Sequence, residues 1–199
     1  MRILYLLTLA AAVAVPVALH ATPITYSESF IGSGSVANGN ITEQFVDQLV
    51  TLTAVGDTDN VVNGSRSDIF VNIMPTTFSI AGGLDGAFSD LIKVVANQGG
   101  GVAGMGDNTI DAALMFTRNS AFSTYDLKTA IGPLTGSSSF NPGTSFTTSG
   151  GAFTIDSAGD STFQATTGVS AVPEPSSLVL LGTGALGVLG LIKRKLFAA

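Results

Sequence analysis

Two short stretches of the sequence gather oxygen-bearing side chains at a spacing that could hold a hard cation. The first is Asp57-Thr58-Asp59-Asn60, and the second combines Asp107, Asn108 and Asp111. Calcium takes carboxylate and amide oxygens as ligands, but neither stretch completes the D-x-[DN]-x-[DN]-G-x₅-E loop. Asp and Asn also stabilise turns by bonding to their own backbone, so a calcium site and plain turns are both open. The candidate calcium ligands are Asp57, Asp59, Asp107 and Asp111.

The other residue types restrict the chemistry further. There is no cysteine, and the one histidine, His20, lies in the N-terminal apolar segment. Zinc and copper prefer His and Cys ligands, and a serine nucleophile needs a neighbouring base. Some pair of carboxylates is inevitable in so acidic a chain, so spacing alone does not identify a glycosidase. We therefore predict that the protein is not an enzyme and needs no cofactor, with calcium as the remaining candidate metal.

A glycine-rich stretch at residues 99–104, GGGVAG, formally matches the G-x-G-x-x-G pattern of dinucleotide sites. Such a site needs a helix after the pattern and an acidic residue about 20 positions further on. Here Asp107 and a strand-like segment at 110–117 follow too soon. We interpret the stretch as a flexible loop.

The central part of the chain is acidic. Residues 22–172 contain four basic and thirteen acidic side chains, which gives a net charge of −9. Nucleic acids and anionic lipid surfaces both require clustered Lys and Arg, so we exclude both as partners of this part of the chain. The acidity suits a soluble exported protein.

The N-terminus has the layout of an export signal. Met1 and Arg2 precede an almost wholly apolar run at 3–19, and Ala21 marks a plausible cleavage point. We predict that residues 1–21 form a signal helix that the export machinery recognises and that is cut near Ala21. An uncleaved anchor is the alternative, but the run is shorter than the roughly 20 residues that a membrane span usually needs.

Short apolar runs separated by turn residues fill the middle of the chain. Residues 49–55 alternate most clearly, with Val50, Leu52 and Ala54 on one face and threonines on the other. Residues 41–50 could form a helical turn or a strand, and the alternation that follows favours a strand. Ala158-Gly159-Asp160 is one of the turn signals. Further strands are expected at 24–31, 68–74, 77–80, 91–96, 110–117, 145–148, 152–156 and 161–167.

This pattern of many short strands predicts the fold class. Repeated turn signals between alternating strands are typical of antiparallel all-β domains. We predict that residues 22–171 form one exported domain, an antiparallel β-sandwich or a jelly-roll-like fold.

The C-terminal segment is uniformly apolar and ends in positive charge. Residues 178–192 are all apolar, Gly or Thr, and would span about 23 Å as a helix, against roughly 30 Å of hydrocarbon. Flanking serines and lysines can extend this span, so we predict a single transmembrane helix. The cluster Lys193-Arg194-Lys195 would stay cytoplasmic and retain the chain in the membrane. A buried core helix is the alternative, which the three terminal charges disfavour.

The order of these features resembles a known sorting signal. Val172-Pro173-Glu174-Pro175, the apolar segment and the basic cluster are together similar to the PEP-CTERM signal, here at residues 172–197. The resemblance implies a bacterium with exosortase, an integral-membrane cysteine protease or transpeptidase that recognises Pro173, Glu174 and Pro175 and removes the tail. It also implies an exported protein that is transiently anchored and then reaches the cell surface or extracellular matrix. Proteins of this family are linked to exopolysaccharide and biofilm formation.

The middle of the chain also looks like an all-β domain often found in front of this tail, a resemblance that supplies no catalytic residues. The matching stretches are 45–61, 101–116, 125–140 and 149–167. The leading hypothesis is a structural or adhesive matrix protein. The alternatives are a carbohydrate-binding module and, less favoured, a polysaccharide hydrolase. The chain has no Trp, and most Phe residues fall at inward positions, so no sugar platform is evident from the sequence.

Overall fold

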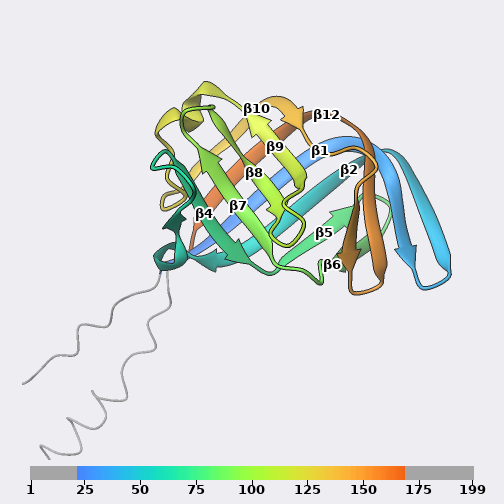
Figure 1. Ribbon diagram of the computed structural model, residues 1–199. Coiled ribbons are helices and arrows are strands. Elements are labelled where there is room, and N and C mark those ends of the chain that lie inside the picture. Colours follow the sequence, from blue (N-terminus) through green and yellow to red (C-terminus); the bar gives the residue numbers. More distant parts are fainter. Residues whose placement is uncertain (1–21, 169–199) are drawn as a thin grey trace, which may run out of the picture.

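The computed structural model describes residues 22–168, and these residues fold almost entirely into β-strands (Figure 1). Two short 3₁₀ helices, η1 (Thr58–Asn60) and η2 (Ser120–Thr124), interrupt them. The strands are β1 (Pro23–Asn38), β2 (Ile41–Asp57), β3 (Val62–Asn63), β4 (Ile69–Met74), β5 (Thr76–Ile80), β6 (Leu84–Ala87), β7 (Ile92–Asn97), β8 (Val102–Asp107), β9 (Ala113–Arg118), β10 (Ile131–Ser139), β11 (Ser145–Thr148) and β12 (Gly151–Thr167).

All named strand pairs are antiparallel and belong to one sheet. Its order is β3-β4-β7-β8-β9-β10-β12-β1-β2-β5-β6, and β11 pairs with β12 beside this path. The prediction of an antiparallel all-β domain is therefore confirmed for the described residues.

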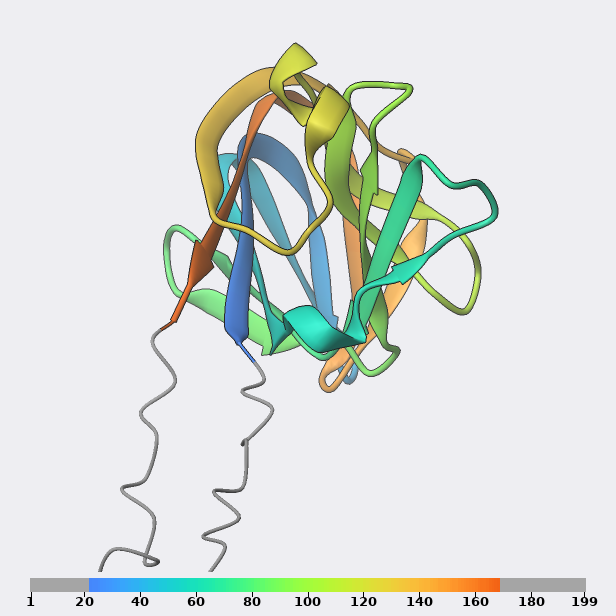
Figure 2. The same ribbon diagram turned by 90° about the vertical axis from the view of Figure 1, so that its left-hand side faces the viewer.

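The sheet curls on itself, so that two layers face each other across a core (Figure 2). Strand β10 passes from one layer to the other. Its first part, from Ile131 to Gly136, pairs with β12, and its last three residues, from Ser137 to Ser139, pair with β9. Because of this crossing strand, the two facing layers are continuous rather than separate sheets.

Two groups of aromatic side chains fill the interior between the layers. In one group Phe78 lies 4.8 Å from Phe153 between ring centroids, and in the other Phe122 meets Phe163 edge-on at 5.6 Å. Such offset and edge-to-face pairs add to the hydrophobic stabilisation of the rings. The first group comprises Phe45, Phe78, Phe88, Phe146 and Phe153, and the second Tyr26, Phe122, Tyr125 and Phe163.

Several predicted boundaries change in the structure. Residues 41–50 form part of strand β2, as the alternation favoured. The turn predicted at Ala158-Gly159-Asp160 is wrong, because β12 runs through it. Phe30 pairs with Ser161 and Gly32 with Ala158, so the extra residues make a bulge opposite β1. The strand expected at 110–117 begins only at Ala113. The flexible loop expected at 99–104 is a turn up to Gly101, after which β8 begins.

The two ends of the described chain lie side by side. Strands β1 and β12 pair from Ile24↔Thr167 onward, and the Gly168 amide donates to the Pro23 carbonyl at 2.9 Å. Within residues 22–168, no helix has the length and apolar character that a membrane crossing requires. The predicted signal helix, with Ala21, and the predicted transmembrane helix lie outside the described residues.

Candidate functional site

The outer face of strands β4, β7, β8, β9 and β10 carries a shallow groove. Strand registers place its side chains in two rows across the sheet. One row runs Val71, Val95, Gly104, Phe116 and Ser139, and the next runs Ile69, Asn97, Val102, Arg118 and Ser137. Alternate residues of each strand point inward to the core, so both rows face outward.

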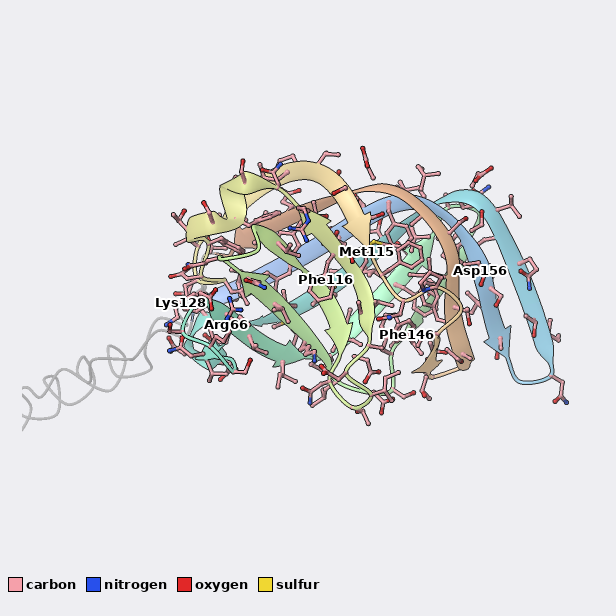
Figure 3. The ribbon with its side chains drawn as sticks, turned by 45° about the horizontal axis from the view of Figure 1, so that its top comes forward. Arg66, Met115, Phe116, Lys128, Phe146 and Asp156 are labelled. Carbon is pink, nitrogen blue, oxygen red and sulfur yellow. The ribbon has the colours of Figure 1, made fainter. Side chains whose placement is uncertain are left out.

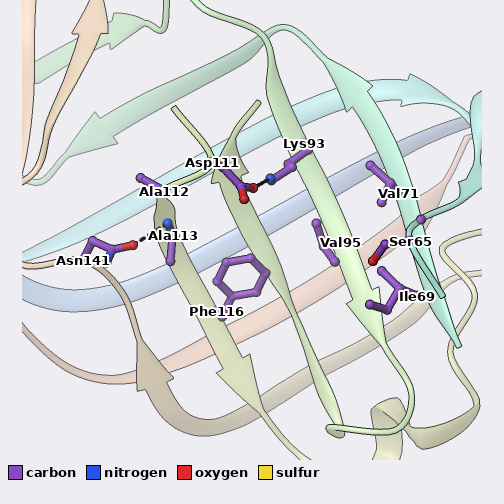
Figure 4. Close-up of a pocket in the computed structure, with 11 residues that line it drawn as sticks. Ser65, Ile69, Val71, Lys93, Val95, Asp111, Ala112, Ala113, Phe116 and Asn141 are labelled. Atoms are coloured by element: carbon purple, nitrogen blue, oxygen red, sulfur yellow. Dashed lines mark hydrogen bonds and ion pairs between the residues drawn. The ribbon is translucent and has the colours of Figure 1, made fainter. Parts of the chain in front are cut away.

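Phe116 lies in the middle of this groove, above two glycines of the neighbouring strand β8. A β-carbon at Gly104 would lie 2.9 Å from Phe116 Cδ1, and one at Gly106 would lie 3.6 Å from Phe116 Cζ. The ring therefore extends over both positions and occupies space that side chains on β8 would otherwise fill. Figure 4 shows the ring among the groove residues. The two glycines allow an aromatic ring to lie along the surface of the sheet.

Phe116 is also exceptional among the phenylalanines of the described chain. The other ten are either buried in the core or partly buried and packed against it, whereas Phe116 belongs to neither set. It is half-buried and has no aromatic neighbour among the ring pairs found in this part of the chain. Its register on β9 and its place in the lining of the groove put it on the outer face, and Figure 3 labels the residue. An outward aromatic ring is a surface for stacking against a ligand.

One end of the groove is polar. Lys93 from β7 forms an ion pair with Asp111 from the β8–β9 connection. The Asn141 side chain accepts a hydrogen bond from the Ala113 amide at 2.6 Å, which holds the amide group at the rim. These residues and Phe116 line a hollow of about 530 Å³ (Figure 4).

The hollow continues past Phe116 toward Arg118. A second region of about 310 Å³ shares Phe116 with the first and is lined by Asn97, Arg118 and the serines 137–139. Arg118 is exposed, and its Nη1 donates to the Gly100 carbonyl at 2.7 Å. The groove thus combines one aromatic face with amides, hydroxyls and a cation.

The first pair of predicted calcium ligands lies at η1, away from this groove. Asp57 caps η1, because its carboxylate accepts a hydrogen bond from the Asp59 amide at 2.9 Å. This is the turn chemistry that the sequence left open. Asp59 follows in the first turn of η1 and is exposed.

The second pair separates in the structure. Asp107 is buried, and its carboxylate accepts hydrogen bonds from the amides of Thr109 and Ile110. Asp111 is exposed and pairs with Lys93, which lowers the pKa of its carboxyl through that hydrogen bond and charge. Within residues 22–168, no group of three or more His, Cys, Asp or Glu side chains is placed to hold a metal ion.

A buried carboxyl that the sequence did not single out lies in the core. Glu28 of β1 has no exposed surface, and it accepts a hydrogen bond from the Thr117 hydroxyl of β9 across the two layers. The Thr117 hydroxyl also lies 2.6 Å from the Ser161 hydroxyl of β12. Glu28 Oε2 has no hydrogen-bond partner. Burial raises the pKa of Glu28 to about 8, against the lowering effect of its hydroxyl neighbours.

The predicted sorting residues Pro173, Glu174 and Pro175 and the basic cluster Lys193-Arg194-Lys195 lie outside the described residues. Comparison with family models matches residues 171–195 to the PEP-CTERM protein-sorting motif. The match covers the tail and leaves the β domain unassigned. No curated protein and no solved structure matches the chain.

Proposed function

We propose that this chain is an exported bacterial protein which exosortase sorts through its PEP-CTERM tail to the cell surface or extracellular matrix. There the β domain, a sandwich or jelly-roll-like module, serves a non-enzymatic structural or adhesive role in exopolysaccharide or biofilm. The observation that carries the sorting part is the motif match at residues 171–195. The matrix role is supported by the export signal predicted at residues 1–21 and by the net acidity of the domain.

The placement of the chain ends fits this route. Gly168, the last described residue, lies beside Pro23 at one end of the domain, where Arg66 and Lys128 also lie (Figure 3). A tail attached there would hold this end toward the membrane before processing. The groove lies along the side of the domain and would stay accessible in the anchored state.

The sorting proposal is tested by the mass of the exported protein. We expect the chain to lose its apolar segment when it is co-expressed with an exosortase, and to keep it in a host without one. Replacing Pro173-Glu174-Pro175 by alanines should prevent the loss, because the protease would lack its recognition tripeptide. Replacing Ser176-Ser177 by alanines is the matched control and should be processed normally. Retention of residues 178–192 in the presence of exosortase would refute the proposal.

A second candidate, a carbohydrate-binding module, is favoured by one observation, the outward ring of Phe116 over Gly104 and Gly106. Sugar rings present an apolar face to aromatic side chains and hydroxyls to polar ones. We expect the exported chain to be retained on exopolysaccharide, with and without calcium, and Phe116→Ala to reduce this retention. Val55→Ala, an exposed position on β2, is the control.

The non-enzymatic part of the proposal has its own measurement. Incubation with the same exopolysaccharide should release no reducing ends. Turnover that disappears on changing single Asp or Glu residues would instead establish a hydrolase.

A further inference from the structure

We propose that the groove selects an acidic polysaccharide, with a sugar ring stacked on Phe116 and the carboxylate of a uronic acid bound by Arg118. This inference rests on the carbohydrate-binding function proposed above. It adds the class of polysaccharide that binds and the residue, Arg118, that distinguishes this class from neutral polysaccharides. Nothing in the tail motif bears on it, because the inference concerns only the outer face of strands β4, β7, β8, β9 and β10.

The first argument is that Arg118, the basic side chain beside Phe116, is not part of an ion pair among the described residues. The described residues form two ion pairs, Arg66 with Asp68 and Lys93 with Asp111. Arg118 belongs to neither, although the domain carries a large excess of carboxylates. One of its donors bonds to the Gly100 carbonyl at 2.7 Å, which orients the guanidinium and leaves further N–H groups for a ligand.

The second argument is spacing. Phe116 and Arg118 are two residues apart on β9 and point to the same face, so their Cα atoms are about 7 Å apart. A uronic acid carries its carboxylate directly on the sugar ring. A ring stacked on Phe116 can therefore turn this carboxylate toward the guanidinium, where a planar, two-bonded contact is favoured.

The third argument is the set of neutral polar groups beside these two residues. Ser139 pairs with Phe116 and Ser137 with Arg118 across the β9–β10 ladder. Asn97 lines the same hollow from the β7 side. Hydroxyl and amide groups both donate and accept hydrogen bonds, as sugar hydroxyls do. Polar groups thus adjoin the ring and the guanidinium directly on the β10 side, and Asn97 lies beyond Val102 on the other side.

The net charge of the whole domain further restricts the kind of acidic polysaccharide that can bind. The net charge of −9 for residues 22–172 repels a dense polyanion at long range, while the Arg118 contact acts only at close range. The ligand that satisfies both conditions has uronic acids spaced between neutral sugars. We therefore expect weaker binding to a polymer made of uronic acid alone.

The test compares two matched oligosaccharides on the exported chain. Oligosaccharides from gellan contain glucuronate between neutral sugars, and chemical reduction of their carboxyl groups gives the neutral counterpart. Calorimetry should show tighter binding of the acidic form. Arg118→Gln should weaken binding of that form by roughly tenfold, the usual value of a charged hydrogen bond, and leave the reduced form unchanged.

Two further variants separate the possible outcomes. Phe116→Ala should weaken both forms, and Lys128→Gln, which removes a cation outside the groove, should weaken neither. The acidic-ligand inference would be overturned if the parent chain bound the acidic and the reduced oligosaccharide equally well. It would also be overturned if Arg118→Gln and Lys128→Gln lost the same affinity for the acidic form. Either result would still be consistent with a groove that binds sugars. Binding of neither form would overturn the carbohydrate-binding function itself. Unchanged thermal unfolding midpoints establish that each variant is folded.

Discussion

Glu28 should make the stability of this domain decrease as the pH rises. Its carboxyl is buried between β1, β9 and β12, and burial raises its pKa from the ordinary value of 4.5 to about 8. The folded state therefore holds a proton that the unfolded chain releases near pH 4.5. Stability from this group is fully present below pH 4.5 and is lost as the pH rises toward 8.

The size of the effect follows from the two pKa values. With an unfolded pKa of 4.5 and a folded pKa of about 8, the free energy of unfolding falls by roughly 3–4 kcal/mol between pH 5 and pH 8. For a domain of this size, such a loss lowers the unfolding midpoint temperature by roughly 10 °C. Asp68 and Asp111 have lowered pKa values, so their contributions change only below pH 3.8, outside this window.

The variant Glu28→Gln isolates this effect. Glutamine keeps the shape of the protonated carboxyl, including the oxygen that accepts from Thr117, but it does not ionise. We expect the stability of the variant relative to the parent to rise by roughly 3–4 kcal/mol from pH 5 to pH 8. The Gln amide nitrogen takes the place of Oε2, which has no hydrogen-bond partner, so it lowers the stability of the variant by an amount that does not depend on pH. Denaturant unfolding at a series of pH values measures the difference.

The matched control is Glu43→Gln, because Glu43 is the other glutamate of the domain and is exposed on β2. This variant should retain the pH dependence of the parent protein. The reasoning about burial would be refuted if Glu28→Gln and the parent showed parallel pH profiles between 5 and 8. A parent stability that rises with pH in this window would refute it equally.

Three further changes test the core, the groove and the turns. Tyr26→Phe should lower the free energy of unfolding by about 1–3 kcal/mol in denaturant melts, because its buried hydroxyl donates to the Leu127 carbonyl at 2.6 Å. Gly104→Val should lower both the retention on exopolysaccharide and the free energy of unfolding, the latter by roughly 3 kcal/mol or more, because a β-carbon there would lie 2.3 Å from the Met115 carbonyl oxygen and 2.5 Å from Phe116 Cα, so that the backbone of β9 must shift together with the ring. Calcium addition should leave the thermal midpoint unchanged, because Asp107 already accepts two backbone amides; a rise of several degrees would contradict this.

Much of the fold was predictable, because the alternation of apolar and polar residues along a strand can be recognised within a short stretch of sequence. The strand at 49–55 and the stop at Pro75 appear in β2 and β4 as expected. Strands β8 and β10 were not predicted, because β8 carries two glycines and an Asp among its six residues, and β10 consists mostly of Gly and Ser, residues that are typical of loops. Their strand structure comes from pairing with neighbours, which single-chain periodicity does not reveal. The bulge at residues 158–160 escaped prediction for the same reason, since its turn-forming residues are held by β1.

The candidate groove could not be derived from the sequence, because its central feature joins residues from two strands. Alternation identifies two faces of a strand, but where neighbouring positions of one strand are all apolar it does not say which face is the core. In "ALMFTR" at β9, Leu114, Met115 and Phe116 look equally fit for burial, yet only Phe116 points outward. The strand register places Phe116 opposite Gly104 of β8. A larger residue at position 104 would occupy the space of the Phe116 ring. The same register aligns Arg118 with Ser137, so the pairing of β8, β9 and β10 is what turns scattered residues into a site.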